Sequence, residues 1–430
     1  MSEVLLIDYG ASRIKSVYYS SIFESHIDSF ESEGSFMKYG NSKSIPSSFF
    51  SNSMVCHLDY YFNESGIKKS KKDLKIYICS EMHGYALVPE GGSKEVFYSS
   101  WRFNHSRTDI AIKILEENNF IAKTMMKLRP GLPVVNVLGE FLDNSLKKNS
   151  VLLTLPQLIC NELGEHYGRA CKTILHSSGF YSELGEKEDA YLITGQNLPI
   201  LFPSVLDDYA KPIGCISFKG YEFNLYFGFG DLQAAFLGSE VKNDQILINI
   251  GTGSQIISNS KNKSSFGLEE RPFFNKEKLQ CISHIPAGRF FESWNKFYKR
   301  LDLDINFWEQ LINLVENDFK EGVLEINFNS FLDSKSSAFD EIYNMVKTNN
   351  KISQKTILKS LINSFANQYS SFLDGKISAK SKVVLGGGIP NKIPILSWLL
   401  KNKLEREVLV LGDKETLTLK GMKKFLINQF

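Results

Sequence analysis

The chain has 430 residues, of which 43% are hydrophobic and 23% are charged, and its formal net charge at pH 7 is +2. This length predicts two domains of about 200 residues each, and the composition is that of an ordinary globular protein. A nearly neutral chain lacks the basic excess of proteins that bind nucleic acid or an anionic membrane. We therefore expect neither among its partners.

The six cysteines are scattered without Cys-x-x-Cys spacing, which predicts neither a structural zinc site nor a disulfide framework. No charged and then apolar signal segment opens the sequence, and no apolar run approaches the roughly 20 residues of a membrane helix. We expect a cytoplasmic protein. A homodimer is one open possibility for its oligomeric state.

The first predicted elements are strands at 4–7 and 14–19, two apolar runs joined by a short turn. Residues 28–54 are rich in serine, glycine and asparagine, which indicates short strands and exposed loops. Apolar residues recur at helical spacing over 108–128 and again over 151–169.

A strand at 76–79 runs into Ser80-Glu81-Met82-His83-Gly84. Prolines then punctuate 196–215, and we place a domain boundary just beyond them, which gives domains 1–221 and 222–430. The second half opens with an apolar stretch leading into Gly230-Asp231.

After Asp231 comes a strand at 246–250 and then the loop Gly251-Thr252-Gly253-Ser254. The strand at 382–385 precedes the triplet 386–388, and a further strand covers 407–411. The remaining periodic segments predict helices at about 287–301, 306–319, 337–347, 353–373 and 416–430.

Two segments about 240 residues apart resemble each other. Residues 6–12 and 248–254 both run from a strand through a polar residue into glycine and small hydroxyl residues. A duplicated domain would place two such loops opposite each other across a cleft. Asp231 lies in a glycine-flanked turn upstream of the second loop, where backbone N–H groups can face an anion. This layout favours phosphoryl transfer with Asp231 as the base; the alternative is a turn-capping carboxylate.

In this order, these segments resemble the FGGY family of carbohydrate kinases, within the actin, hexokinase and Hsp70 ATPase superfamily. The resemblance covers essentially the whole chain. It implies an α/β fold of two RNase H-like (actin-like ATPase) domains with an active-site cleft between them, and it implies ATP and Mg²⁺ as cofactors. The positions that match the family's nucleotide and phosphate motifs are Asp8, Gly10, Ala11, Ser12, Gly251, Thr252, Gly253, Gly387 and Gly388. Asp8 and Asp231 would hold Mg²⁺, through water, and Asp231 would be the catalytic base.

Other motifs are similar to those of sedoheptulokinases and xylulokinases within this family. Met82-His83-Gly84 and Asp231-Leu232-Gln233 carry this likeness, together with 247–255 and 176–180. The resemblance therefore implies a small-molecule sugar substrate. Its predicted contacts are Met82, His83, Trp101, Arg102, Asp231 and Gln233. His83 and Trp101 are alternatively core residues, and Arg102 would reach a hydroxyl or the phosphate of an already phosphorylated substrate.

The sequence departs from the family pattern at several positions. Ala11 replaces the usual threonine of the first phosphate loop, and Phe103 stands where the family's sugar-contact segment has an acid. Leu232 follows the catalytic acid, where xylulokinases tend to have asparagine. We expect an ATP-dependent ketose kinase acting on a heptulose or pentulose. The alternatives are a kinase for glycerol, an alditol or a deoxy-ketose, and a nucleotide-binding regulator that has lost catalysis.

Overall fold

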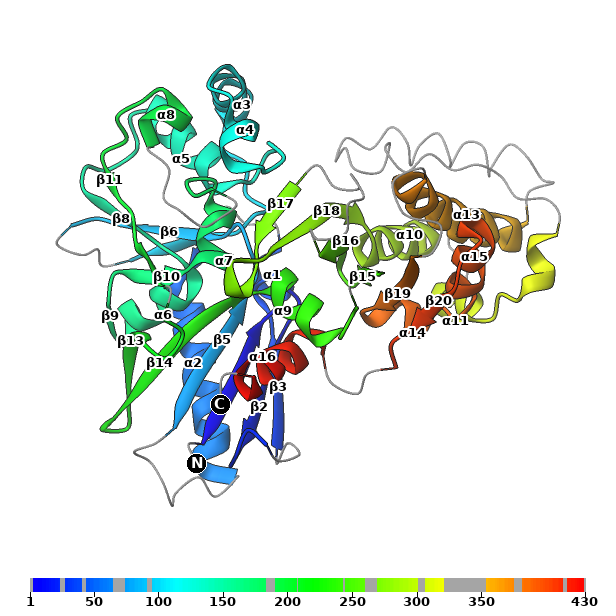
Figure 1. Cartoon of the computed structure of the whole chain (residues 1–430), viewed down its shortest axis with the longest axis horizontal. Helices are drawn as coiled ribbons and strands as arrows, with labels where there is room; N and C mark the ends of the chain where they lie inside the picture. Colours follow the sequence, from blue (N-terminus) through cyan, green and yellow to red (C-terminus); the bar gives the residue numbers. More distant parts are fainter. Residues whose placement is uncertain are drawn as a thin grey trace. The chain divides into compact units, whose positions relative to one another are not determined.

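The computed structural model describes residues 3–23, 28–40, 44–64, 74–90, 95–182, 190–206, 208–242, 244–259, 269–300, 306–320, 353–374, 381–412 and 416–428. The chain forms two compact units (Figure 1). Unit 1 comprises Met1–Glu240, Leu268–Leu279 and Glu415–Phe430, and unit 2 comprises Val241–Gly267 and Gln280–Lys414. The division expected between residues 221 and 222 falls inside unit 1, at the start of a strand.

Unit 1 is built on a seven-stranded sheet with the order β3-β2-β1-β5-β14-β13-β9. The predicted hairpin of the first two strands is confirmed, since β1 pairs antiparallel with β2. β5 pairs in parallel with both β1 and β14, so these three strands end at the same edge of the sheet. The strands are β1 (Val4–Tyr9), β2 (Arg13–Tyr19), β3 (Asp28–Glu33), β5 (Lys75–Ser80), β9 (Gly164–His166), β13 (Pro212–Phe218) and β14 (Tyr221–Gly230).

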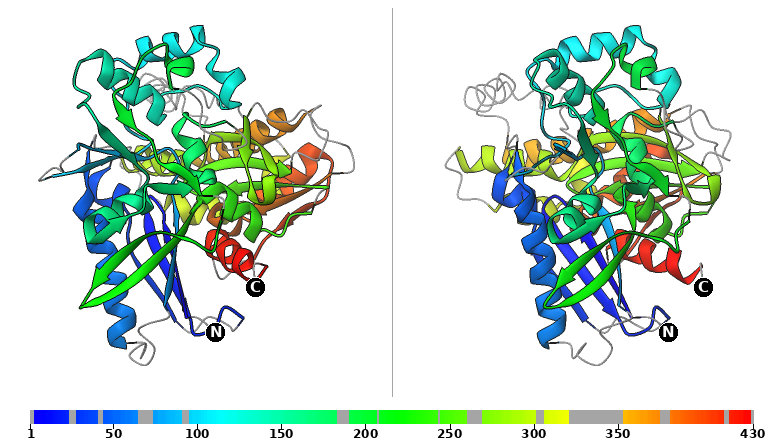
Figure 2. Two further views of the ribbon diagram at one scale, coloured as in Figure 1. Left: turned by 60° about the vertical axis from the view of Figure 1, so that its left-hand side comes forward. Right: turned by 90° about the vertical axis from the view of Figure 1, so that its left-hand side faces the viewer.

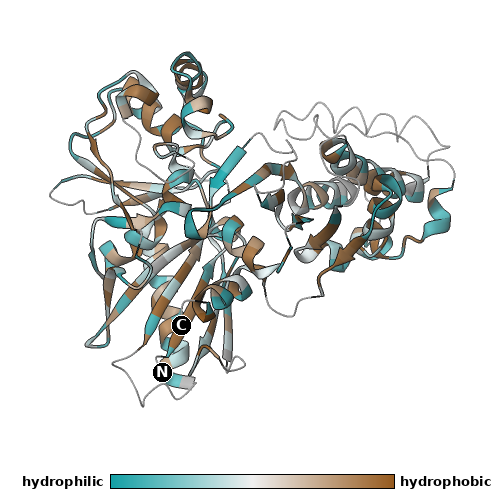
Figure 3. Cartoon of the chain, in the orientation of Figure 1, coloured by the Kyte–Doolittle hydropathy of each residue, from teal (hydrophilic) through white to brown (hydrophobic). Residues whose placement is uncertain are grey.

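Helices cover both faces of this sheet. Figure 2 shows α2 along one face and α16 along the other. The central strands read as continuous apolar runs, as expected when neither face meets water, and hydrophobic residues dominate them in Figure 3. The helices of unit 1 are α1 (Ser35–Tyr39), α2 (Ser47–Glu64), α3 (Thr108–Glu117), α4 (Phe120–Thr124), α5 (Pro133–Leu142), α6 (Leu155–Leu163), α7 (Lys172–Leu175), α8 (Ala190–Thr194), α9 (Asp231–Gly238) and α16 (Leu417–Ile427).

A five-stranded sheet with the order β11-β8-β6-β7-β4 and a two-stranded pair, β10-β12, complete the sheets within unit 1. A second apolar cluster packs α3, α4 and α5 against this part of the unit. These strands are β4 (Ile45–Pro46), β6 (Tyr85–Val88), β7 (Phe97–Ser99), β8 (Ser150–Leu153), β10 (Arg169–Cys171), β11 (Ile200–Leu201) and β12 (Ser204–Leu206). β17 (Glu269–Pro272) also belongs to unit 1.

Unit 2 repeats the central pattern of unit 1. β15 (Gln245–Ile250) and β16 (Gly253–Asn259) form an antiparallel hairpin, and β15, β19 (Lys382–Gly386) and β20 (Val408–Val410) run in parallel. The order is β18-β16-β15-β19-β20, with β18 at Lys278–Pro286. The similarity between residues 6–12 and 248–254 in the sequence thus corresponds to the same strand pairing in the two units. The helices are α10 (Gly288–Arg300), α11 (Phe307–Ile312), α13 (Gln354–Leu373), α14 (Gly388–Lys392) and α15 (Ile395–Leu404).

Three sequence predictions were wrong in detail. Residues 28–54 contain the first part of α2, whose buried Phe50, Met54 and Leu58 follow helical spacing that the serine-rich composition obscured. The helix expected over 108–128 ends and restarts because Asn119 has a left-handed backbone with φ of 57°. The segment 151–169 begins as a strand. Its helix starts only after Thr154, which forms a capping box with Gln157.

The helix expected at 337–347 lies outside the described residues. Among the helices that the structure describes, none is both long and apolar enough to cross a membrane. Short 3-10 helices cover His176–Ser178, Phe274–Lys276 and Glu316–Phe319.

α9 and α16 lie against each other in backbone contact. A Cβ atom added at Gly421 would lie 1.9 Å from the carbonyl oxygen of Ala234, and one added at Gly238 would lie 1.9 Å from that of Leu417. Only glycine allows this approach. The contact fixes α16, although it comes from the far end of the chain, on the helix that begins at Asp231.

We predict that Gly421→Ala lowers the free energy of unfolding by about 1–3 kcal/mol, because the added methyl group forces the two helices apart. Gly412→Ala is the matched control, since nothing lies within 4 Å of a Cβ atom there and its backbone does not have a positive φ. Urea unfolding followed by circular dichroism measures both. Equal midpoints for the two variants would contradict the close contact.

Candidate active site

Two aspartates lie at the edge of unit 1 where the parallel strands end. Asp8 is the penultimate residue of β1, and Asp231 directly follows β14. Cys79 of β5 lies between them, because it pairs with Asp8 on one side and with Phe229 on the other. The two aspartates are therefore separated at the backbone by roughly 10 Å, two strand spacings. The topology thus brings together the two acids that the sequence singled out.

Asp231 is the first residue of α9, and its Oδ1 accepts a hydrogen bond of 2.8 Å from the Leu232 N–H. Burial, with the negative charge of Asp8 as the next cause, raises its pKa from 3.8 to about 7. Glu81 adds to the rise, whereas the Leu232 N–H and the Arg271 charge oppose it. Asp231 therefore exchanges a proton near neutral pH, as a general base at this pH must.

Asp8 is held from the opposite end of the chain. Its Oδ2 accepts a short hydrogen bond from the Thr418 hydroxyl of α16. Burial raises the pKa of Asp8, and the contacts with Thr418 and Cys79 and the charge of Lys15 partly offset this rise. The C-terminal helix thus contributes directly to the edge where Asp8 and Asp231 meet.

His83 follows β5 and has a left-handed backbone with φ of 63°. Its N–H donates to the Ser177 hydroxyl, and its Nδ1 lies 2.7 Å from the Ser177 carbonyl oxygen. A carbonyl only accepts, so Nδ1 carries the proton. Nε2 is then the acceptor, and it faces Arg129 Nη2 at 2.9 Å and Arg271 Nη1 at 3.3 Å. The predicted sugar-contact histidine is therefore a neutral ring fixed at both nitrogens.

The two arginines share one carboxylate. Arg129 Nη1 donates to Glu269 Oε1 at 2.8 Å, and Arg271 Nη2 donates to Glu269 Oε2. Arg271 is 1% exposed, Glu269 3% and Arg129 14%. The sequence analysis identified none of these three residues, because Glu-Glu-Arg-Pro on a short strand has no recognisable pattern.

Glu81 and Arg102 form a second buried ion pair beside Met82. Arg102 Nη1 donates to Glu81 Oε2 at 3.1 Å, and Nη2 donates to the Ser35 hydroxyl at 3.2 Å. The guanidinium also stacks 5.5 Å from the ring centroid of Trp101. The charge of Arg102 is therefore directed at Glu81, and Trp101 supports that pair.

Met82 and Gln233 are both buried. Gln233 is completely inaccessible, and its Nε2 donates to the carbonyl oxygen of Pro272 at 3.0 Å. It ties α9 to β17, the strand that carries Arg271. The structure thus gives Gln233 an anchoring contact within unit 1.

The first predicted phosphate loop, 10–12, connects β1 and β2. The carbonyl oxygens of Ala11 and Ser12 accept hydrogen bonds from the N–H groups of Phe36 and Gly34. A Cβ atom at Gly34 would lie 2.4 Å from the Ala11 carbonyl oxygen. Hydrogen bonds to its carbonyl oxygens thus hold the loop in place.

The second loop lies in unit 2 between β15 and β16. The Gly251 N–H donates to the Gly253 carbonyl oxygen, and the Gly251 carbonyl oxygen accepts from the Gly288 N–H at the start of α10. A Cβ atom at Gly288 would lie 2.7 Å from that carbonyl oxygen. Gly251 therefore shapes a tight turn, and its amide is already used in it. Thr252, at the tip, is exposed.

The glycine triplet ends β19 in the same unit. Gly387 has a φ of 88°, and a Cβ atom there would lie 2.4 Å from the Ile250 carbonyl oxygen. Gly388 begins α14 and is exposed. Because β15 and β19 are parallel, the loops after these two strands lie at one edge of the sheet. The structure thus brings the two predicted nucleotide loops of unit 2 together.

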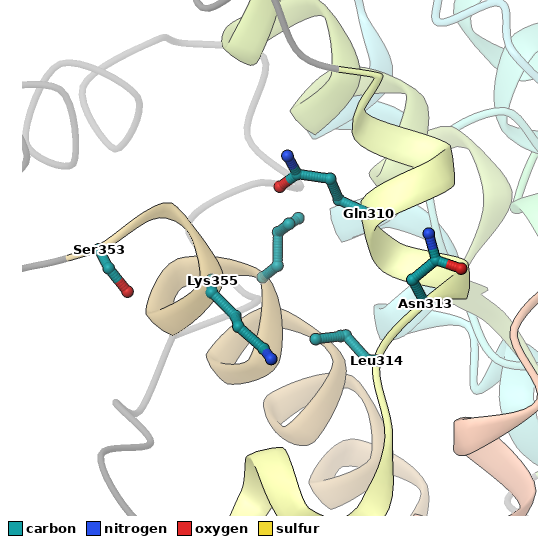
Figure 4. Close-up of a pocket in the computed structure, with 6 residues that line it drawn as sticks. Gln310, Asn313, Leu314, Ser353 and Lys355 are labelled. Atoms are coloured by element: carbon teal, nitrogen blue, oxygen red, sulfur yellow. The ribbon is translucent and has the colours of Figure 1, made fainter.

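Two pockets, one in each unit, are lined by residues other than these aspartates and glycine loops. One of about 490 Å³ in unit 2 lies where α11 meets the start of α13 (Figure 4); its lining residues are Gln310, Asn313, Leu314, Ser353, Lys355 and Leu358. Another of about 350 Å³ in unit 1 is lined by residues that include Tyr85 and Glu140. Neither contains a predicted catalytic or phosphate-binding residue.

Among the residues that the structure describes, no three His, Cys, Asp or Glu side chains converge as a metal centre. Asp8 and Asp231 nevertheless suit Mg²⁺, which prefers oxygen ligands and retains several waters. Each carboxylate is buried enough that its pKa rises, and the charge of Asp8 raises the pKa of Asp231 further. A divalent cation near both would relieve this repulsion.

No protein-family model and no curated protein sequence matches the chain. Solved structures do match. A xylulose kinase from Rhodospirillum rubrum has a TM-score of 0.72 at 12% identity, over 100% of this chain and 90% of that chain. A glycerol kinase from Plasmodium falciparum, solved with ADP, has a TM-score of 0.71 at 16% identity, over 98% and 88% of the two chains.

A gluconate kinase from Lactobacillus acidophilus has a TM-score of 0.68 at 13% identity, over 100% of this chain and 91% of that chain. The chain has the carbohydrate-kinase fold. The expected class, an α/β fold of two actin-like domains, is thereby confirmed. In this carbohydrate-kinase fold, the predicted positions divide between Asp8, Asp231 and the sugar motifs in unit 1 and the glycine loops 251–253 and 387–388 in unit 2.

We predict that Arg102→Gln lowers the free energy of unfolding at pH 8 by about 3–5 kcal/mol, because it leaves the Glu81 carboxylate buried without its counter-charge. Burial already raises the pKa of Glu81 above 4.5. A carboxyl with a raised folded-state pKa destabilises the fold increasingly as pH rises above its unfolded value, so the loss should shrink toward pH 5. Denaturant unfolding at both pH values measures it.

The double variant Glu81→Gln/Arg102→Gln is the control. It removes both charges and keeps polar side chains at both positions, so it should recover much of the lost stability. A double variant as unstable as Arg102→Gln at pH 8 would show that the charge of Glu81 is not the cause.

Proposed function

We propose that the protein is an ATP-dependent carbohydrate kinase that transfers the γ-phosphoryl group to a terminal hydroxyl of a sugar. The observation that carries this proposal is the position of Asp231. It lies at the carboxyl edge of a carbohydrate-kinase fold, beside a second carboxylate, and has a pKa of about 7. An aspartate with an ordinary pKa is a weak base at neutral pH. The raised pKa of Asp231 lies close to neutral pH, where a general base is most effective.

Asp231 accepts the proton of the attacking hydroxyl as the new oxygen–phosphorus bond forms, and the bond from the γ-phosphorus to the ADP oxygen breaks. The Leu232 N–H holds Oδ1 of Asp231. This contact orients the carboxylate and leaves Oδ2 to meet the acceptor.

Nucleotide-binding positions are proposed in the glycine loops of each unit, taken one unit at a time. The edge formed by 251–253 and 387–388 supports adenosine and phosphate binding in unit 2, since glycine lets backbone approach phosphate oxygens closely. The loop 10–12 of unit 1, held at its carbonyl side, is assigned to the phosphates as well. Asp8 and Asp231 would hold Mg²⁺ through water, and the ion supplies charge neutralisation of the phosphates when bound.

The acceptor is assigned as a ketose of five or seven carbons. The basis of this assignment is the Met82-His83-Gly84 segment, which lies beside Asp231 in the fold. His83 positions the arginines that face its Nε2, and Trp101 stacks on Arg102. Glycerol and alditols are the alternative acceptors, since the fold is shared with a glycerol kinase.

We predict that Asp231→Asn lowers turnover by at least the roughly 10²–10⁴-fold typical of a general base and leaves ATP binding within about twofold. In the wild type, kcat/KM should fall as pH decreases below about 7, because the base becomes protonated. Coupled ADP release with Mg·ATP and a panel of ketoses, aldoses and polyols measures both. Turnover near that of the wild type in Asp231→Asn would remove Asp231 from this role.

We predict that Thr418→Val lowers turnover by roughly 10-fold, since Asp8 loses a charge-assisted hydrogen bond. Thr418→Ser keeps the hydroxyl and should retain turnover. Valine has nearly the shape of threonine, so α16 stays in place and the melting temperature should change little. If Thr418→Val and Thr418→Ser were equally active, the hydroxyl would have no part in the reaction.

A further inference from the structure

One short helical segment of unit 1 contacts both the backbone of the proposed base and the segment proposed to bind the acceptor. α7 continues directly into the 3-10 helix at His176–Ser178, so Thr173 and Ser177, four residues apart, lie on the same helical face. Thr173 is 0% exposed and Ser177 2%. The Thr173 hydroxyl contacts Gly230, which precedes the base, and the Ser177 hydroxyl contacts His83.

Thr173 fixes the backbone immediately before Asp231. Its Oγ1 accepts a hydrogen bond of 3.2 Å from the Gly230 N–H. Gly230 is the N-cap of α9, and Asp231 is the first residue of that helix. A Cβ atom added at Gly230 would lie 3.3 Å from the Thr173 carbonyl oxygen and 3.3 Å from Met82 Sδ. Thr173 therefore holds the backbone on the N-terminal side of the base, whereas the Leu232 N–H holds the carboxylate itself.

The Thr173 side chain is itself held within its own segment. Cys171 caps α7, since its Sγ accepts a hydrogen bond of 3.4 Å from the Thr173 N–H, and the same Sγ lies 3.1 Å from Thr173 Oγ1. A hydroxyl oxygen has two lone pairs, so Oγ1 can accept from the Gly230 N–H whichever of these two groups is the donor. The contact with Cys171 thus keeps the hydroxyl in place for Gly230.

Ser177 holds His83 in an uncommon backbone conformation. His83 has a φ of 63°, and such conformations persist where the surrounding contacts impose them. The His83 N–H donates to Ser177 Oγ at 3.1 Å, and its Nδ1 donates to the Ser177 carbonyl oxygen at 2.7 Å. The Ser177 hydroxyl donates in turn to the Ile174 carbonyl oxygen of α7. Ser177 therefore fixes both the backbone and the ring of the central residue of Met82-His83-Gly84.

Apolar side chains at these two positions would suffice to pack the segment. A buried hydroxyl costs dehydration, and the hydrogen bond that it makes returns only a modest net stabilisation. What the hydrogen bond adds is a defined direction and distance. Both Thr173 and Ser177 direct this contact at a backbone N–H, one beside the proposed base and the other within the proposed acceptor segment.

We propose that Thr173 and Ser177 are positioning residues that fix the Asp231 base and the His83 segment relative to each other, so that the acceptor hydroxyl meets the base. This proposal rests on the kinase activity proposed above. Thr173 acts on the transfer step through Gly230, and Ser177 acts on acceptor binding through His83. A misplacement of about 1 Å at a reacting group can cost on the order of 100-fold in rate, so hydrogen bonds that fix both groups to one helical segment favour the reaction.

The first test is Thr173→Val, which removes the acceptor for the Gly230 N–H and nearly keeps the shape of the side chain. It should lower kcat by roughly tenfold and leave the KM values for ATP and for the sugar within about twofold. Thr173→Ser keeps the hydroxyl and should retain most of the turnover. The full chain is assayed by ADP release with Mg·ATP and the acceptor panel, and calorimetric ATP-binding stoichiometry gives the fraction of active protein by which kcat is normalised.

Thr194→Val is the matched control for Thr173→Val. Thr194 of α8 is also 0% exposed, and its hydroxyl also accepts from a backbone N–H, that of Gln196 at 3.1 Å. Its replacement removes the same kind of hydrogen bond elsewhere in unit 1 and should leave kcat and both KM values unchanged.

The second test is Ser177→Ala, which removes the acceptor for the His83 N–H. It should raise KM for the sugar by roughly tenfold and leave both KM for ATP and kcat within about twofold to threefold. A general loss of structure would not divide its effect in this way, on kcat in one variant and on KM for the sugar in the other. If Thr173→Val fails to fold, Ser177→Ala decides the proposal alone.

The outcomes separate the two proposals. Wild-type constants in both Thr173→Val and Ser177→Ala overturn the positioning roles and keep the kinase. A loss of kcat in Thr173→Val that Thr194→Val shares, or that Thr173→Ser fails to restore, also overturns the role of the Thr173 hydroxyl and keeps the kinase. Absence of transfer by the wild type to every acceptor overturns the kinase and the positioning roles with it.

Discussion

The site of this protein depends on the repulsion between two partly buried carboxylates, those of Asp8 and Asp231, whose strands lie on either side of β5. β1 and β14 both pair with β5, so Asp8 and Asp231 have to end at the same edge. Water would normally screen two such charges, and burial removes much of that screening. The result is an aspartate whose pKa is raised to about 7, first by burial and then by the charge of Asp8, which the order of the three strands brings to the same edge. The surrounding contacts, from Thr418, the Leu232 N–H and Arg271, each moderate this repulsion.

Much of the central architecture could be predicted from the sequence. The apolar runs of β1, β2 and β15 and the loops that follow them are local patterns, and their repetition in unit 2 appears as the same hairpin and parallel strands. Asp8 and Asp231 could be identified because each lies at the end of an apolar strand, close to a glycine. The sequence also singled out Gly387 and Gly388, and Gly387 approaches the Ile250 carbonyl oxygen of β15 so closely that it needs a residue without a side chain.

The partners of those residues could not be predicted, because they depend on contacts between segments distant in the sequence. Thr418 reaches Asp8 across 410 positions, and Arg271 reaches His83 across 188. Gly421 reads as an isolated glycine in an amphipathic segment, and only its contact with Ala234 explains it. The charge of Arg102 was expected at a substrate, yet the adjacent Glu81 binds it.

α16 follows unit 2 in the sequence and yet packs in unit 1, on the helix that begins with Asp231. This arrangement has a consequence for biosynthesis. The ribosome delivers β1, β5 and β14 early, but the hydroxyl that binds Asp8 arrives only after all of unit 2 has been made. A nascent chain can therefore form the central sheet of unit 1 long before its carboxylate edge is complete. The carboxylate edge of unit 1 is therefore completed only after unit 2 has been synthesised.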